Sequence, residues 1–337
     1  MGNTAVVILN YNGVDYLKQF LAKVIEYSKG CKIVVIDNHS SDGSVAYVSA
    51  TFPEVQLIKL PENYGFSGGY NRGLQQVEAS NYVLLNSDVE VTENWIDHLQ
   101  QYMDQHIEVA ACQPKILSLK QRDTFDYAGA AGGFLDILGY PFCRGRIFDS
   151  LEQDRHQYQD NRKIFWAGGA CFFIRAEVYH QLGGLDEDFF AHMEEIDLCW
   201  RIHRAGYQVA YVGASKIYHL GGGTLKETNP RKTFLNFRNG LQLLVKNSAI
   251  HQLIWKIPLR ILLDMVAAFR FLFLGLFAHF WAVVRANSTF LWTFAQTWSK
   301  RSVVNLPYGG SLFSRLIVWE YYVKGKKTFA QLTKTSP

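Results

Sequence analysis

Short apolar runs alternate with segments of helical periodicity along the first third of the chain. The runs that predict strands are Ala5–Leu9, Ile33–Ile36, Val55–Lys59 and Tyr82–Leu85. The helices predicted between them are Val14–Ser28, Ser44–Thr51 and Tyr70–Ala79. Strands that alternate with helices indicate an α/β fold with a mostly parallel sheet. Because the strands are almost wholly apolar, we expect helices on both faces of that sheet.

The pattern changes after this region. Thr92 is expected to cap a helix that runs to about Met103, and residues 118–160 then lose periodicity and are rich in Gly, Tyr, Phe and Arg. A long irregular stretch of this kind is usually a functional loop or a disordered segment. Order returns with a predicted strand at Phe165–Arg175 and a predicted helix at Glu194–Ala205.

Residues 253–298 are densely apolar and aromatic. Ile261–Val284 has the length of a membrane span but contains Asp264, Arg270 and His279, and a central Asp or Arg costs ~3 kcal/mol. On a helical wheel the charged residues fall within about 120°, and they are Lys256, Arg260, Asp264, Arg270 and Arg285. One charged side favours a helix lying in the membrane interface. A buried packing helix and a spanning helix are the alternatives.

Charge divides the chain at about the same place. The net charge is +4, but residues 246–337 hold 12 basic and 2 acidic residues, which leaves 22 basic and 28 acidic residues in 1–245. We therefore expect a catalytic domain over 1–245 and a basic, aromatic-rich, helical membrane-associating tail over 246–337. The five cysteines form no C-x-x-C pair, which argues against a disulfide framework or zinc site and for a reducing cytosol.

Three predicted strands end in small polar or acidic residues. These ends are Asn10-Tyr11-Asn12, Asp37–Gly43 and Asn86–Glu90. One such ending is usually a turn, but ligands of open α/β sheets bind beyond the carboxyl ends of the strands. In the third ending, Asp88 and Glu90 are two residues apart. Hard oxygen ligands suit Mg²⁺ or Mn²⁺, and such a cation stabilises a departing diphosphate, although this short motif has little specificity alone.

Two further segments carry candidate chemistry. Residues 61–73 form a glycine-rich loop that enters a helix, and a helix N-terminus favours anionic groups. Glu194, Glu195 and Asp197 open a later helix. Acidic residues there complement the helix dipole, and a carboxylate held near an acceptor hydroxyl is also what a general base requires.

The ordered set of motifs is similar to a known family. It comprises N-Y-N, D-N-x-S-x-D-G, N-x-G-F-x-G-G-x-N-x-G, N-S-D-V-E, W-x-G-G-A and G-L-D-E-x-F-F…E-E-x-D-L-x-x-R. Together they resemble the inverting family 2 glycosyltransferases of GT-A fold, and within these the bacterial rhamnosyltransferase-like branch that builds surface polysaccharides. The resemblance covers roughly residues 4–245.

The resemblance implies roles for individual residues. The nucleotide-sugar donor would be held by Asn10, Asn12, Asp37, Asn38, Asn63, Gly65, Gly69, Asn71, Ser87 and Asp88. A divalent metal would be held by Asp88, Glu90 and His219, with Glu90 standing where many relatives have Asp or a neutral residue. The acceptor side would include Trp166, Gly168, Gly169 and Arg201, together with a loop over 126–146.

The family base is the second acid of an acidic pair, which here is Glu195. Glu194 is its rival, and Asp197 belongs to the same catalytic set. The implied reaction is an inverting in-line transfer, with dTDP-rhamnose as the first expected donor and a glycan or lipid-linked acceptor. The protein is expected at an anionic membrane surface on the cytoplasmic face of the inner membrane, with no nucleic-acid partner. A sugar-phosphate nucleotidyltransferase and an inactive sugar-nucleotide-binding scaffold are the alternatives.

Overall fold

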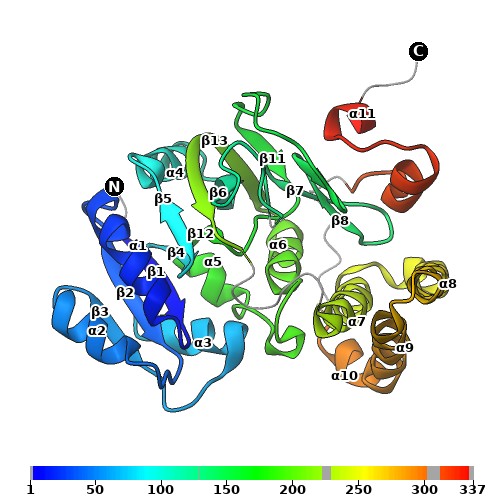
Figure 1. The fold of residues 1–337 in the computed structure, drawn as a ribbon, viewed down its shortest axis with the longest axis horizontal. Helices are drawn as coiled ribbons and strands as arrows, with labels where there is room; N and C mark the ends of the chain where they lie inside the picture. The colour runs from blue at the N-terminus through cyan, green and yellow to red at the C-terminus, as the bar shows by residue number, and fades with distance from the viewer. Residues whose placement is uncertain (1–2, 128, 222–228, 302–311, 334–337) are drawn as a thin grey trace.

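The computed structural model describes residues 3–127, 129–221, 229–301 and 312–333 (Figure 1). Its centre is a nine-stranded sheet. One half is parallel and has the strand order β3-β2-β1-β4. These strands are β1 (Thr4–Asn10), β2 (Lys32–Asp37), β3 (Gln56–Lys59) and β4 (Asn81–Asn86). This confirms the mostly parallel α/β sheet expected from the sequence.

The other half of the sheet is mixed. Beyond β4 the order is β12-β6-β13-β11, and β5 pairs with β13. These strands are β5 (Val89–Val91), β6 (Val109–Ser118), β11 (Arg162–Ile164), β12 (Cys171–Arg175) and β13 (Gln208–His219). Because β5 follows β4 after only two residues and pairs antiparallel with the end of β13, it brings the two halves of the sheet together at their polar ends.

Helices cover both faces of this sheet. One core contains side chains of α1 (Val14–Tyr27), α2 (Ser44–Thr51) and α4 (Trp95–Gln105). The core on the other face contains side chains of α3 (Gly65–Leu74), α5 (Ala176–Gln181) and α6 (Glu194–Arg204). Burial on both faces explains why the strands read as continuous apolar runs.

Two predicted elements have different limits in the structure. Helix α3 begins five residues before the predicted Tyr70, because its glycines let it pack closely on the sheet. A Cβ on Gly73 would lie 2.2 Å from Ile36 Cδ1. The strand predicted at Phe165–Arg175 starts only at Cys171, since the Gly168 N–H donates to the side chain of Gln113 (2.8 Å) instead of continuing a strand.

The stretch 118–160, expected as a functional loop or a disordered segment, contains a second sheet. Its order is β10-β9-β8-β7. The strands are β7 (Gly133–Leu135), β8 (Pro141–Cys143), β9 (Arg146–Ile147) and β10 (Ser150–Leu151). Strands of two or three residues are too short to show the alternation by which a strand is recognised in a sequence.

The chain continues into a helical module, which we define as α7 (Pro230–Asn247), α8 (Ile250–Phe273), α9 (Phe277–Trp292) and α10 (Phe294–Ser299). The domain boundary expected at 245/246 falls inside α7, which packs on α6 as well as on α8, α9 and α10 (Figure 1). The chain then returns to the second sheet through η2 (Trp319–Val323) and α11 (Phe329–Thr333). Phe329 packs on Phe134 with ring centroids 5.0 Å apart.

The amphipathic helix α8 has the opposite orientation to that of an ordinary surface helix. Its charged residues Lys256, Arg260 and Asp264 are buried against the protein. Arg260 Nε donates to Asp264 Oδ1 (2.9 Å) and Arg260 Nη1 to the Leu138 carbonyl (3.1 Å). The sequence predicts that the charged side of this helix faces the membrane interface. In the structure, the part of that side formed by these three residues packs against the protein instead.

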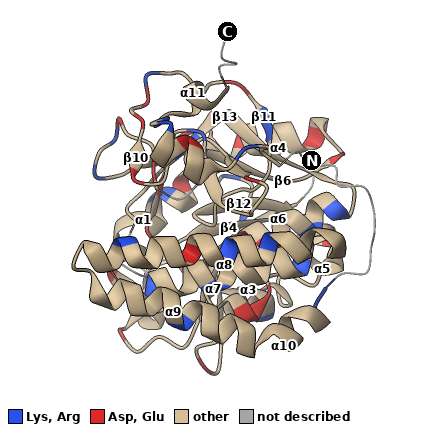
Figure 2. Ribbon diagram, turned by 90° about the vertical axis from the view of Figure 1, so that its right-hand side faces the viewer, with Lys and Arg blue, Asp and Glu red and all other residues tan. Residues whose placement is uncertain are grey.

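The outward faces of α8 and α9 are apolar. Phe273 is 87% exposed and Trp292 is 90% exposed. The two helices lie side by side; α8 carries four charged residues, of which three are buried, and α9 carries Arg285 (Figure 2). The other exposed apolar side chains of the module include Ile254, Leu262, Val266, Phe269, Leu274, Phe277, Trp281 and Leu291. Among the described residues, no helix combines the length and the hydrophobicity needed to cross a bilayer.

Candidate active site

Polar side chains at the ends of β1 and β2 form one network. Asn10 and Asp37 are register partners, and Asn10 Nδ2 donates to Asp37 Oδ1 at 3.2 Å. Asn38 Nδ2 donates to Asn63 Oδ1 (2.9 Å) and to the Gly65 carbonyl (3.0 Å). Asn10 Oδ1 is buried without a hydrogen-bond partner among the described residues. The structure thus brings these five residues together at the sheet edge where α/β proteins bind nucleotides.

Three other residues expected at the donor make contacts within the protein. Asn12 Oδ1 accepts from a backbone N–H in the loop after β2 (2.8 Å). Gly69 is buried, and a Cβ there would lie 2.7 Å from Leu9 Cδ1. Asn71 bonds both the carbonyl (2.8 Å) and the N–H (3.0 Å) of Leu185. Asn71 therefore ties α3 to the segment 182–193 that precedes α6, which we call the acidic loop.

A carboxylate and an imidazole meet beyond β4. Asp88 follows the partly exposed Ser87 in the turn before β5, and its Oδ1 lies 3.2 Å from His219 Nε2 at the end of β13. His219 Nδ1 lies 3.1 Å from Asp126 Oδ2. Burial opposes the charged imidazolium, but its hydrogen bonds to the carboxylates of Asp126 and Asp88 outweigh this and raise the pKa of His219 to about 10.

Asp88 and His219 could hold a divalent ion, provided that His219 Nε2 gives up its proton when the ion binds. Mg²⁺ and similar ions commonly take one or two protein ligands and complete their shell with substrate phosphates and water, and Asp126 would orient the imidazole from behind. Within the described part of the chain no three His, Cys, Asp or Glu side chains form a complete protein cage. The structure does not bring Glu90 to this pair, since its carboxylate contacts Arg122 and also Lys23 (3.6 Å).

The segment before α6 is held in an unusual backbone conformation. Phe190, His192 and Met193 have φ angles of 64°, 68° and 77°, and such conformations in non-glycine residues cost about 1–3 kcal/mol each. Strain of this kind persists only where the surroundings enforce it. Here it directs the chain so that Glu194 and Glu195 form the first turn of α6.

Three side-chain atoms of this segment are buried without a partner among the described residues. They are His192 Nε2, Glu194 Oε2 and Glu195 Oε2. Burial raises the pKa of Glu195 to about 7. It also raises the pKa of Glu194 well above its usual range, to which the neighbouring Glu195 adds. Buried polar atoms are normally satisfied, so a cluster of unsatisfied ones indicates a ligand-facing site.

Asp197 and Arg201 have structural partners. Asp197 is fully buried, with Oδ2 accepting from Arg201 (2.8 Å) and Lys246 (2.9 Å) and Oδ1 accepting from Asn247 (2.8 Å). Burial alone would raise the pKa of Asp197, but Arg201 and Lys246 lower it. Arg201 also donates to two carbonyls of the turn 182–184. Neither side chain is free to meet a proton or an acceptor.

Of the residues expected on the acceptor side, Gly169 lies close to Glu195. A Cβ on Gly169 would be 4.0 Å from Glu195 Oε1, so the glycine leaves room beside this carboxyl group. The N–H of Gly168 is used by Gln113, and Trp166 Nε1 donates to a carbonyl of β7 (3.0 Å). Gly169 therefore borders the site, while Trp166 and Gly168 fix the backbone around it.

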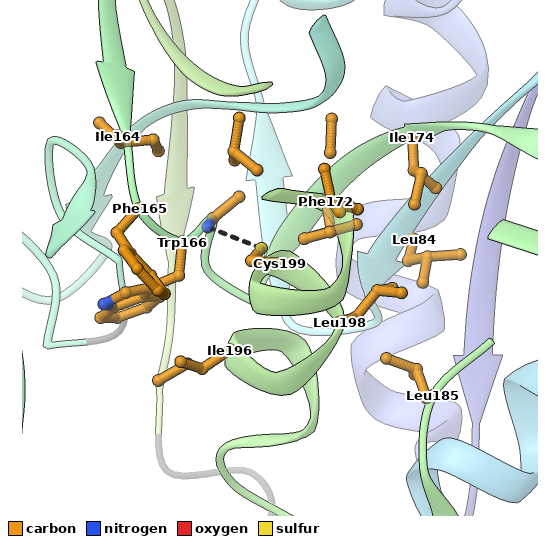
Figure 3. Packing of buried hydrophobic residues seen from close by; sticks show 14 of the residues in the cluster. Leu84, Ile164, Phe165, Trp166, Phe172, Ile174, Leu185, Ile196, Leu198 and Cys199 are labelled. Atoms are coloured by element: carbon orange, nitrogen blue, oxygen red, sulfur yellow. Dashed lines mark hydrogen bonds between the residues drawn. The ribbon is translucent and has the colours of Figure 1, made fainter. Parts of the chain in front are cut away.

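Helix α6 is seated on the sheet by apolar contacts, which fixes the position of its first turn. Leu198 and Cys199 belong to the same buried core as Phe172 and Leu84 of the strands below (Figure 3). The backbone N–H of Ala167 donates to Cys199 Sγ at 3.5 Å.

Helix α7 holds the strained loop through its polar side chains. The fully buried Asn239 donates through Nδ2 to the carbonyls of Phe189 (3.0 Å), Ala191 (2.9 Å) and His192 (2.7 Å). Arg238 donates to the carbonyl of Phe189 (3.1 Å). No sequence motif indicated Asn239 or the His219 partner Asp126, because each acts on residues far away along the chain.

Charged residues extend this contact. Lys246 Nζ lies 2.5 Å from Asp186 Oδ2, and Lys300 Nζ lies 2.7 Å from Asp186 Oδ1 and 2.6 Å from Asp188 Oδ2. Burial would raise the pKa of Asp186, but Lys246 and Lys300 lower it to about 2. The helical module is thus joined to the acidic loop by the Lys246–Asp186 pair, by the exposed Lys300 and by the buried Asn239.

The fold has the architecture of a GT-A glycosyltransferase. Its sheet has a parallel, nucleotide-binding half and a mixed half, and acidic residues open helix α6. Comparison with known proteins gives the family. Residues 5–183, more than half of the chain, match the family described as Glycosyl transferase family 2, and the chain belongs to that family.

Individual relatives agree with this assignment. The chain is 26% identical over 233 residues to the N-acetylglucosaminyl-diphospho-decaprenol L-rhamnosyltransferase of Mycobacterium tuberculosis, covering 64% of this chain and 75% of the relative. It is 22% identical over 222 residues to the rhamnosyltransferase WbbL of Escherichia coli, covering 64% and 82%.

Solved structures share the fold at lower identity. A mannosyltransferase from Pyrobaculum calidifontis, in complex with GDP-Man and Mn²⁺, superposes with a TM-score of 0.54 at 14% identity over 86% of this chain and 87% of that one. GalNAc-T7 with UDP, GalNAc and Mn²⁺ superposes with a TM-score of 0.57 at 16% identity, over 73% of this chain and 48% of that one.

Proposed function

We propose that this family 2 glycosyltransferase is an inverting, metal-dependent enzyme in which Glu195 is the general base. The observation that carries the proposal is the cluster of buried, unpartnered atoms at His192, Glu194 and Glu195 beside Gly169. Of the three acids considered from the sequence, Asp197 is fully paired, which leaves Glu195 and Glu194. Glu195 is the better base, because its pKa of about 7 allows it to be ionised near neutral pH.

In the proposed reaction the acceptor oxygen forms a bond to the anomeric carbon as the bond from that carbon to the nucleoside diphosphate breaks. Glu195 takes the acceptor proton, and the anomeric configuration inverts. A divalent ion, when bound, would neutralise the departing diphosphate, and Asp88 with His219 would hold it. Asn10, Asp37, Asn38 and the loop from Asn63 to Gly65 would bind the nucleoside.

The proposed donor is dTDP-rhamnose and the proposed acceptor is a glycan or lipid-linked sugar in the synthesis of a bacterial surface polysaccharide. Support comes from the two rhamnosyltransferases among the relatives, one of which is named for a diphospho-decaprenol-linked substrate. At 26% and 22% identity these relatives indicate a direction for experiments on the donor.

The test is incubation of the full chain with Mn²⁺ and a panel of nucleotide sugars, with mass detection of released nucleotide. Release of a nucleoside diphosphate from one donor supports the proposal of an inverting glycosyltransferase. Release of dTDP from dTDP-rhamnose supports the proposed donor as well. Release of pyrophosphate from a sugar phosphate and a nucleoside triphosphate would instead identify a nucleotidyltransferase. Donor binding without any turnover, even with acceptor extracts, would identify an inactive scaffold.

We also propose that the helical module attaches the enzyme peripherally to an anionic membrane, on the cytoplasmic face of the inner membrane. The exposed apolar faces of α8 and α9 support this, since contiguous apolar surface with aromatic side chains suits the interface. Several basic residues of the tail are already paired with acids, among them Lys246, Lys300 and Arg260. The free energy gained by burying apolar side chains in the membrane should therefore exceed that gained from the attraction of basic residues to anionic lipid.

A further inference from the structure

A hollow lies between the start of α7 and helix α9. Its volume is about 340 Å³, within the ~300–1,000 Å³ range of small-molecule sites. The walls combine two guanidinium groups, Arg231 and Arg285, with the apolar side chains of Phe234, Ala278 and Trp281. This combination suits a ligand that has an anionic group and a hydrocarbon part.

The positive charges of the two arginines are available to a ligand. Each lies near an aromatic ring, with Arg231 Cζ 4.8 Å from the centroid of Phe190 and Arg285 Cζ 5.7 Å from that of Phe234. Among the described residues, no carboxylate lies within ion-pair distance of either guanidinium group, whereas Arg260 and Lys246 of the same module are paired. Arginine is well suited to phosphate, which it can bind through two parallel hydrogen bonds.

The hollow is connected to the active site on one side. Phe190, on which Arg231 stacks, precedes Glu194 by four residues and borders the donor loop, since a Cβ on Gly65 would lie 3.8 Å from Phe190 Cε2. One aromatic ring thus separates the arginine from the loop assigned to the donor. A ligand in the hollow would have its anionic end directed toward the place of transfer.

On its other side the hollow joins the exposed apolar surface. Trp281 is 59% exposed and packs on Phe280 at 5.2 Å between ring centroids. Phe280 packs on Phe269 of α8 at 6.0 Å, and Phe269 is itself exposed. A continuous row of aromatic side chains therefore leads from the hollow onto the face that we propose meets the membrane.

We propose that this hollow binds the phosphate or diphosphate of a lipid-linked acceptor, with Arg231 and Arg285 on the anionic group and the lipid chain leaving along Trp281. The inference rests on the proposed function, because it names the acceptor class of the same enzyme. It accounts for two arginines that have no carboxylate partner among the described residues, at a point where the apolar surface approaches the loop Asn63–Gly65.

The experiment measures binding of farnesyl diphosphate to the full chain by calorimetry, in EDTA so that no metal can hold the diphosphate at the donor site. Farnesol and inorganic pyrophosphate are the comparison ligands. The variants are Arg231→Gln with Arg285→Gln, and the matched control is Arg162→Gln, an exposed arginine on the edge strand β11. We expect the double variant to bind farnesyl diphosphate at least tenfold more weakly and the control to bind it unchanged.

Farnesol and pyrophosphate should each bind at least tenfold more weakly than farnesyl diphosphate. Equal binding of farnesyl diphosphate by the double variant and the wild type would overturn the proposal. Pyrophosphate binding as tightly as farnesyl diphosphate would also overturn it, by identifying a site for free anions. Release of nucleotide from donor sugars is measured separately on the same protein preparations, with Mn²⁺ in place of EDTA. If that release is absent while farnesyl diphosphate binding depends on the arginines, the proposed transfer fails and the lipid site stands.

Discussion

The side chain of Asn239 provides a direct test of how the active site is held. Substitution with leucine keeps the branched outline of this buried residue, with a larger volume, and removes the two N–H groups that serve three loop carbonyls. Two neutral hydrogen bonds contribute about 1–3 kcal/mol together. The positive φ angles of Phe190, His192 and Met193 store several kcal/mol, at about 1–3 kcal/mol each. Without Asn239 the loop should therefore relax.

Relaxation would move the first turn of α6 while leaving the nucleoside-binding network at β1 and β2 intact. A displacement of about 1 Å in a catalytic group costs on the order of 100-fold in rate. We expect Asn239→Leu to lower kcat by about that factor and to change the dissociation constant for the donor nucleotide by no more than a few-fold. The assays are steady-state transfer and calorimetric titration of the nucleotide, with a melting curve for stability.

The control is Asn236→Leu, one turn earlier on α7, where the described residues show no hydrogen bond from the side chain to the loop. It should retain kcat. If Asn239→Leu melts at a lower temperature but keeps full kcat, the contact of Asn239 with the loop contributes only to stability and the reasoning is refuted. Parallel loss of nucleotide binding would equally refute it, because the damage would then reach the whole sheet edge.

Three further predictions concern the metal, the base and the membrane face. Asp88→Asn should weaken Mn²⁺ binding and lower transfer by orders of magnitude; full activity in EDTA would contradict this. Glu195→Gln should abolish transfer but spare donor binding. Wild-type activity should rise with pH through about 7, since burial raises the pKa of Glu195 to that value and a base acts only when deprotonated. An inactive Glu194→Gln beside an active Glu195→Gln would make Glu194 the base. Phe273→Ser with Trp292→Ser, at positions 87% and 90% exposed, should reduce flotation with anionic vesicles at high salt without lowering the melting temperature; equal flotation would count against the membrane face.

Local patterns were sufficient for the parallel half of the fold. The runs at Ala5–Leu9 and Tyr82–Leu85 lie inside β1 and β4, because a strand buried on both faces has a distinctive apolar run. The network of Asn10, Asp37 and Asn38 was also foreseeable, since parallel strands deliver their ends to one edge of the sheet.

The orientation of α8 was not accessible in the same way. A helical wheel shows that one side carries Arg260 and Asp264, but it does not show what that side contacts. The protein surface below α8 is itself polar, offering the Leu138 carbonyl and the Tyr140 hydroxyl, so the charged side packs inward. The partnerships of Asn239 with the acidic loop and of Asp126 with His219 arise from contacts between distant segments, for which no local pattern exists.

The return of the chain to the second sheet has a consequence during synthesis on the ribosome. Phe142 forms part of the core of that sheet, and Phe313 and Phe329 pack against it. At ~5–20 residues per second, about 10–40 seconds separate the emergence of Phe142 from that of Phe329. The apolar helices α8 and α9 emerge within this interval. If α8 and α9 attach to the membrane as we propose, a nascent chain could dock before its second sheet is closed, and the order of translation would favour docking first and completion of the enzyme afterwards.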